Sequence, residues 1–150
     1  MGTDVASTIV TISLLLVREG RALVVRRHGG HSESPGAWDL PGGRLLDWED
    51  DIDAAVLRIA QEELGVRSTG YEFFATQYAP LVGGEPRVDN LYIVDTWEGD
   101  PRINSIDQHD AMKWAQLEEL AHLPLVEPRR TLVQRLFGGT GDSLGESGWF

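Results

Sequence analysis

The sequence predicts an α/β fold, in which a mixed sheet lies between helices as an α/β/α sandwich. Strand-like segments rich in β-branched residues come before and after one strongly amphipathic helix, and shorter helical segments follow near the C-terminal end. This order favours a sheet that is covered on its faces. The chain has 150 residues, 41% of them hydrophobic, so it can bury the core of one domain.

The first elements are predicted to be short strands. Residues 7–17 and 22–27 are apolar and β-branched, and they are separated by a Glu-Gly turn at 19–20, so we expect a hairpin. A further short strand is expected at 38–40. The Pro-Gly-Gly sequence at 41–43 is expected to end it with a backbone that glycine adopts freely.

Residues 51–64 are expected to form an amphipathic helix. Acidic residues stand at its start and Gly65 just past its end, as helix termini favour. Its apolar residues recur at intervals of three and four: Ile52, Val56, Leu57, Ala60 and Leu64.

The second half of the chain predicts more strands and then two helices. Segments 71–78 and 88–97 read as strands around a glycine- and proline-containing turn, with a third short strand at 112–115. A short helix is expected at 116–122. Pro128 suits the first turn of another helix that runs to Phe137.

A single domain is therefore expected over residues 1–137. The glycine- and serine-rich residues 138–150 predict a flexible C-terminal tail.

Composition excludes several classes of function. The chain has no cysteine, so it offers neither disulfides nor thiolate chemistry. Its net charge of -11 opposes binding to a nucleic-acid backbone, and a polyanionic ligand would need a divalent cation. No apolar run is long enough to span a bilayer, so we expect a cytoplasmic protein without membrane contact. The oligomeric state stays open, a homodimer included.

The segment 58–66, Arg-Ile-Ala-Gln-Glu-Glu-Leu-Gly-Val, resembles the end of the Nudix hydrolase signature. The resemblance implies a Nudix-like sandwich over nearly all of residues 5–137. Two departures stand out. Ile59 occupies the place of the first helix glutamate of the signature, and one extra residue before Arg58 leaves either Glu49 or Asp50 as the early acidic residue.

The helix predicts a metal site. Residues three and four apart share one helix face, so positions 59, 62 and 63 are expected to cluster. Glu62 and Glu63 offer hard oxygen ligands suited to Mg²⁺, or to Mn²⁺ in its place. The resemblance adds the carbonyl of Gly42 as a further ligand, and Arg58 is expected to hold the glutamates by a salt bridge.

Ile59 cannot bind a cation or take a proton from water. The general base that activates the attacking water must therefore be another residue, or the activity has been lost. The GDP-mannose mannosyl hydrolase subgroup of the Nudix family is similar in lacking this glutamate. It implies that Gln108 joins the metal shell and that His109 is the general base, for which a histidine with an ordinary pKa near 6.5 is suited.

The remaining candidates concern the substrate. Arg27 at the end of its strand and Arg44 after Pro-Gly-Gly are expected to contact the diphosphate, because a guanidinium matches phosphate oxygens. Tyr92 is a candidate border of a base or sugar, although an aromatic residue in a strand is more often part of the core.

These residues support three hypotheses for the function. The favoured one is a metal-dependent Nudix hydrolase of a nucleotide sugar. In this enzyme His109 activates water for attack at the sugar carbon, and Arg58 and Glu63 complete the catalytic set. A second is a Nudix pyrophosphatase of a nucleoside triphosphate or nucleotide sugar, in which water attacks phosphorus and Glu62, Glu49 or Asp50 is the base. A third is an inactive Nudix-fold domain that binds a small nucleotide derivative.

Overall fold

The computed structural model describes residues 8–29, 36–79 and 86–138. None of the helices in these ranges combines the length and the apolar composition of a membrane-spanning helix. The predicted tail falls outside the described residues apart from its first residue, Gly138, which ends a helix. The elements are β1 (Ile9–Arg18), β2 (Arg21–Arg27), β3 (Trp38–Asp39), β4 (Gly42–Arg44), α1 (Ile52–Leu64), β5 (Arg67–Ala79), β6 (Arg87–Glu98), β7 (His109–Gln116), α2 (Leu117–Leu120) and α3 (Arg129–Gly138).

The strands form a mixed sheet, as predicted. Along its path the order is β3-β2-β1-β6-β5, with β4 paired to β1 and β7 paired to β2. β1 and β6 run parallel over eight residue pairs, from Ile9↔Arg87 to Leu16↔Val94, and the other pairings are antiparallel. β1 therefore lies at the centre of the sheet.

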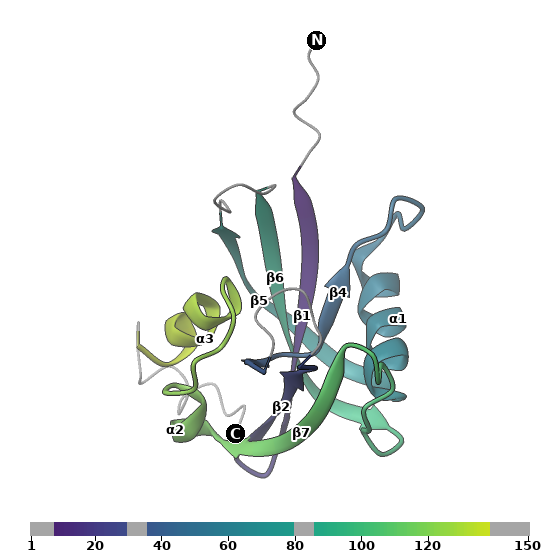
Figure 1. The fold of residues 1–150 in the computed structure, drawn as a ribbon. Coiled ribbons are helices and arrows are strands. Elements are labelled where there is room, and N and C mark those ends of the chain that lie inside the picture. The colour runs from purple at the N-terminus through teal and green to yellow at the C-terminus, as the bar shows by residue number, and fades with distance from the viewer. Residues whose placement is uncertain (1–7, 30–35, 80–85, 139–150) are drawn as a thin grey trace.

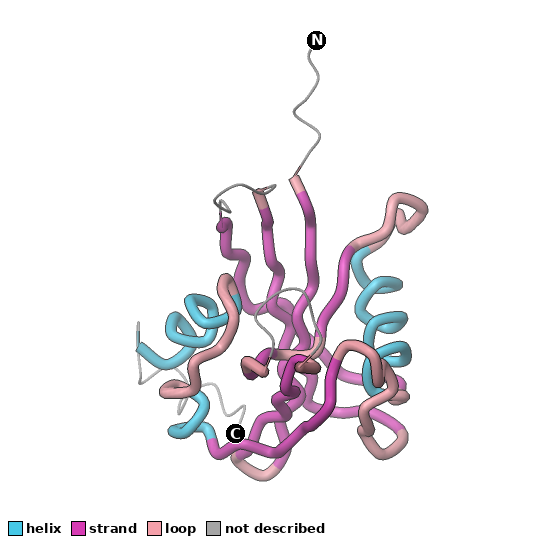
Figure 2. Tube along the Cα trace, viewed as in Figure 1, coloured by secondary structure: helices cyan, strands magenta, loops and turns pink. Residues whose placement is uncertain are grey.

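Helices cover both faces of the sheet (Figures 1 and 2). α1 packs on one face against a core that includes Ile12, Leu14 and Leu16. α2 and α3 cover the other face, where the core includes Leu15 and Val17. Successive side chains of a strand point to opposite faces, so the continuous apolar run of β1 serves both layers. The α/β/α sandwich is confirmed.

The ends of α1 agree with the sequence. The Asp51 carboxylate accepts the backbone N–H groups of Asp53 and Ala54 at 2.7 and 3.3 Å, which caps the first turn. Gly65 closes the helix in a left-handed conformation with φ 69°. The predicted hairpin is also present, with Val17 opposite Ala22.

Gly42 and Gly43 correct one expectation. They form strand β4 beside β1 and neither has the positive φ that favours glycine, which Gly20, Gly36, Gly65 and Gly99 have. Gly42 is needed for space instead, because a β-carbon there would lie 2.5 Å from the carbonyl oxygen of Ile12. Close approach of two backbones, and not an unusual turn, explains this glycine.

Candidate active site

A pocket of about 240 Å³ opens where β2, β3, β4 and β7 meet the last turn of α1 and the first residue of α3. It brings together Arg27, Gly42, Glu63, Gln108 and His109 from the candidate residues. Its lining consists of Arg27, Asp39, Leu40, Gly42, Gly43, Glu63, Gln108, His109 and Arg129.

The backbone of Gly42 faces this pocket rather than β1. The amide of Leu14 donates to the carbonyl of Pro41 at 2.8 Å and that of Leu45 to Val10 at 2.9 Å. In an antiparallel ladder, hydrogen-bonded residue pairs alternate with pairs that exchange no hydrogen bonds. The two bonds therefore place Gly42 and its partner Ser13 in a pair of the second kind. Its carbonyl oxygen is left outside the β1 pairing.

Glu63 is the carboxylate that α1 directs into the pocket. Its side chain is 17% exposed, and its Oε1 lies 3.5 Å from His109 Nδ1. The Ser105 hydroxyl donates to Oε2 at 3.0 Å. Burial raises the pKa of Glu63, the bond from Ser105 opposes that rise, and the nearby negative charges of Glu62 and Asp107 add to it.

His109 reaches the pocket through an irregularity in the sheet. Ala111 pairs with Arg26, but the next pair joins His109 to Arg27, so Asp110 is the extra residue of a bulge. A bulge of this kind turns a side chain toward a different face than regular alternation would. The backbone N–H of His28 also donates to the carbonyl of Gln108 at 2.8 Å, which holds the start of β7 against β2.

Arg58 settles which acidic residue occupies the early position of the signature. Its guanidinium binds both oxygens of Glu49, at 2.7 and 3.0 Å, and Glu62 Oε1 at 2.9 Å. The Glu49 side chain is 1% exposed, whereas Asp50 is exposed. The hydrogen bonds from Arg58 lower the pKa of Glu49 against the opposing effect of burial. Glu49 is therefore a buried ion-pair partner and is not placed to activate water.

Four predicted site residues do not line the pocket: Arg58, which binds Glu49, and Glu62, Arg44 and Tyr92. The Glu62 side chain is 58% exposed and is turned toward Arg58. Arg44 is exposed at the end of β4, where its carbonyl accepts from Arg58 at 2.7 Å. Tyr92 lies in the core on the α1 side, edge-on to Tyr71 and Phe73.

Ile59 lies beside the pocket although it does not line it. Its side chain is 1% exposed, and its Cγ1 would be 3.3 Å from a β-carbon on Gly43. Of the cluster predicted at positions 59, 62 and 63, positions 59 and 63 lie toward the Pro-Gly-Gly segment, whereas Glu62 is exposed and paired with Arg58. At position 59 the helix contributes packing instead of a carboxylate.

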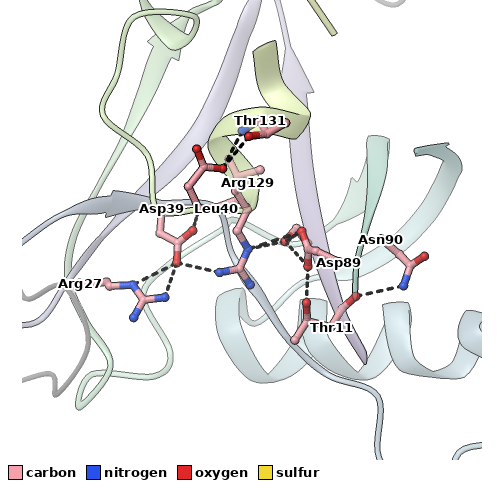
Figure 3. Close-up of polar contacts among 10 residues, drawn as sticks. Thr11, Arg27, Asp39, Leu40, Asp89, Asn90, Arg129 and Thr131 are labelled. Carbon is pink, nitrogen blue, oxygen red and sulfur yellow. Dashed lines mark hydrogen bonds and ion pairs between the residues drawn. The ribbon is translucent and has the colours of Figure 1, made fainter. Parts of the chain in front are cut away.

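Two site residues, Asp39 and Arg129, did not follow from the sequence (Figure 3). Asp39 Oδ2 accepts from Arg27 Nη2 at 3.0 Å and from Arg129 Nη1 at 3.2 Å. Arg129 Nε also donates to Ser13 Oγ at 2.7 Å. The available signals were a charged residue inside the apolar segment 38–40 and a charged residue directly after Pro128. Arg27 therefore lines the pocket and is held there by Asp39, and its contact with a diphosphate stays a prediction.

The donor set decides what kind of metal site this pocket can be. Among the described residues, no group of three or more His, Asp or Glu side chains is placed to hold a metal ion. Glu63, Gly42 and Gln108 all line one pocket, and each carries an oxygen that can bind a metal ion: a carboxylate, a backbone carbonyl and a side-chain amide. Mg²⁺ suits such a partial set, because it keeps several waters and shares its shell with substrate phosphates.

The family follows from comparison with known sequences. The model of the NUDIX domain matches residues 7–136, which is most of the chain. The chain belongs to the Nudix hydrolase family.

Relatives of this Nudix hydrolase support the same fold. It is 28% identical over 119 residues to CTP pyrophosphohydrolase of Escherichia coli (strain K12), covering 78% of this chain and 82% of the relative. It is 30% identical over 103 residues to CMP-5'-(N-acetyl-N-hydroxy-3-aminopropyl)phosphonate hydrolase of Streptomyces rubellomurinus (strain ATCC 31215), covering 69% and 48%. The crystal structure of a MutT NUDIX hydrolase from Burkholderia pseudomallei matches with a TM-score of 0.76 and 30% identity, covering 85% and 96%.

These relatives correct the expected subgroup. They include MutT and a CTP pyrophosphohydrolase, and the predicted nearness to GDP-mannose mannosyl hydrolase is not supported by them. The Nudix assignment itself is confirmed.

Proposed function

We propose that this Nudix hydrolase is a metal-dependent pyrophosphohydrolase of a small nucleotide derivative, either a nucleoside triphosphate or a nucleoside diphosphate linked to another group. The observation that carries the proposal is that Glu63, His109, Gln108 and Gly42 all line one pocket. The relatives support the reaction class, because one of them is a CTP pyrophosphohydrolase.

Glu63, Gln108 and the Gly42 carbonyl would hold Mg²⁺ or Mn²⁺ here. When bound, such an ion neutralises charge on the phosphates and on the departing group. Arg27 lines the same pocket, and Asp39 fixes its guanidinium, so its positive charge would face phosphate oxygen in one orientation.

His109 is the group proposed to take a proton from the attacking water. Its Nδ1 lies 3.5 Å from Glu63 Oε1, and the imidazole lines the pocket beside the proposed metal ligands, where the attacking water would sit. The water oxygen bonds to phosphorus as one P–O bond of the diphosphate breaks. The departing phosphate oxygen keeps the bonding electrons, and the imidazole holds the proton of the water.

Variants of His109, Glu63 and the neighbouring Glu62 test which residues act as general base and metal ligand. We expect Mg²⁺-dependent turnover of a nucleotide from a panel that includes CTP, other triphosphates and nucleotide sugars, with products separated by chromatography. His109→Gln and Glu63→Gln should each lower kcat/KM by about 100-fold or more. Glu62→Gln is the matched control, because Glu62 points at Arg58 outside the pocket. Equal losses in the 62 and 63 variants would contradict the proposal.

A second candidate is attack at a sugar carbon, with nucleoside diphosphate and free sugar as products. The combination of Ile59 at the helix with Gln108 and His109 in the pocket favours it. Hydrolysis of a nucleotide sugar in ¹⁸O-labelled water separates the two reactions. Label in a phosphate product supports the proposed attack at phosphorus, and label in the released sugar supports attack at carbon.

A further inference from the structure

The loop between β6 and β7, residues 99–108, closes the C-terminal end of α1 (Figure 1). The last carbonyls of a helix have no partners within it. Here the backbone N–H groups of Arg102 and Asn104 donate to the carbonyls of Leu64 and Glu63, both at 3.0 Å. The Asn104 side-chain amide reaches two further carbonyls at 3.3 and 3.2 Å. The loop is thus bound to the helix end that carries Glu63.

Ser105 differs from the other loop residues because it contacts the pocket groups themselves. Its hydroxyl donates to Glu63 Oε2 at 3.0 Å, with the Glu62 carbonyl as a more distant acceptor at 3.3 Å. Its carbonyl accepts the backbone N–H groups of Gln108 and His109, both at 3.0 Å. One residue therefore joins the carboxylate on α1 to Gln108, at the end of the loop, and to His109, the first residue of β7.

We propose that Ser105 is a positioning residue of the metal site, whose hydroxyl holds the Glu63 carboxylate in register with Gln108 and His109. The proposal rests on the function proposed above, because it treats Glu63 as a metal ligand. A charge-assisted hydrogen bond to one carboxylate oxygen restricts the rotation of the side chain and leaves the other oxygen directed at the pocket. Partners of this kind orient the ligands that bind the ion.

Binding of Mn²⁺ to the full chain without nucleotide tests this role, read from the electron paramagnetic resonance signal of free Mn²⁺. We expect Ser105→Ala to raise the Mn²⁺ Kd by about tenfold or more, as loss of a partner behind a metal ligand does. Ser105→Thr keeps the hydroxyl and should bind Mn²⁺ like the wild-type protein. Ser105→Val has the shape of the threonine variant without its hydroxyl and should bind as weakly as Ser105→Ala, so the pair remains decisive if the alanine variant does not fold.

Asn104→Ala provides the matched control. It removes two side-chain bonds to the end of α1 but none to Glu63, so it should lower the melting temperature and leave the Mn²⁺ Kd unchanged. Weakening of Mn²⁺ binding by Asn104→Ala as large as that by Ser105→Ala would overturn the role of the hydroxyl, as would equal Kd values in the threonine and valine variants. If Glu63→Gln binds Mn²⁺ as the wild type does, the metal site itself is wrong and Ser105 has no such role.

Discussion

Glu49 and Arg58 form a buried ion pair that fixes the turn before α1 to the helix. Glu49 also accepts the backbone N–H of Leu46 at 2.9 Å, so it stabilises the turn as well as the guanidinium. We expect Glu49→Gln to lower the free energy of unfolding by about 1.5–3 kcal/mol at pH 7, because these hydrogen bonds involve charged groups. Urea unfolding measures the difference.

The stability that Glu49→Gln loses should depend on pH. The pKa of Glu49 is lowered in the folded protein. Its contribution is therefore complete above the unfolded pKa, about 4.3 for glutamate, and is lost as the pH falls through the folded pKa. The difference in the free energy of unfolding between the wild type and Glu49→Gln should shrink as the pH falls below about 4.3. Glu98→Gln removes an exposed pair with Arg67 and should cost about 0–1 kcal/mol at pH 7.

Strand β4 shows how a short element sets the pocket. Gly42 lies between the carbonyl of Ile12 and the guanidinium of Arg129, whose Nη2 would be 3.2 Å from an added β-carbon. We expect Gly42→Ala to cost about 1–3 kcal/mol of stability, because the backbone of β1 cannot move aside cheaply.

Gly29→Ala is the control for Gly42→Ala, since nothing lies within 4 Å of a β-carbon there. It should change stability by less than about 0.5 kcal/mol. Thermal melts of both variants measure the two changes. A larger loss in Gly29→Ala than in Gly42→Ala would show that backbone freedom, and not close approach, governs these glycines.

At the scale of the whole molecule, a buried network of charges joins α3 to the sheet (Figure 3). Arg129 contacts Asp39 on β3 and lies 3.6 Å from Asp89 on β6, which is 0% exposed. Ser13 donates to Asp89 at 2.8 Å. Two guanidinium groups, of Arg27 and Arg129, balance the two carboxylates, as buried charges require.

Removing one charge from this network should therefore be costly. We expect Arg129→Met to lower the free energy of unfolding by about 3–5 kcal/mol, because it removes the guanidinium that lies 3.6 Å from the buried Asp89 carboxylate. Arg130→Met is the matched control, since Arg130 is the next residue and pairs with Glu127 at the surface. It should cost no more than about 1 kcal/mol. Urea unfolding at pH 7 decides between them, and similar losses would contradict the buried network.

Local pattern was sufficient for most elements. The spacing of apolar residues in α1, with Asp51 before it and Gly65 after it, predicts a helix whose ends the structure reproduces. The strands β5 and β6 were also predicted, although both are longer than expected. The local pattern predicts strands that are too short, because pairing with a neighbouring strand, as in the long β5–β6 ladder, extends a strand beyond its apolar residues.

The candidate site was predicted less completely than the fold. The spacing along α1 placed positions 59, 62 and 63 on one face, but it did not show that Arg58 would bind Glu49 and also Glu62, outside the pocket. The role of Asp39 in the site could not be predicted from the sequence, because its partners, Arg27 and Arg129, are 12 and 90 residues away in the chain.

By itself the sequence determined the order of the elements, the caps of α1 and the resemblance of residues 58–66 to a Nudix signature, because these depend on residues close together in the chain. Only the tertiary structure decided which oxygen atoms share a pocket. It brings Glu63 beside Ser105 and His109, and Gly42 beside Arg129, through the bulge in β7, the loop bound to α1 and the pairing of β4 with β1. Contacts between distant segments depend on how the layers pack, and no local pattern encodes them.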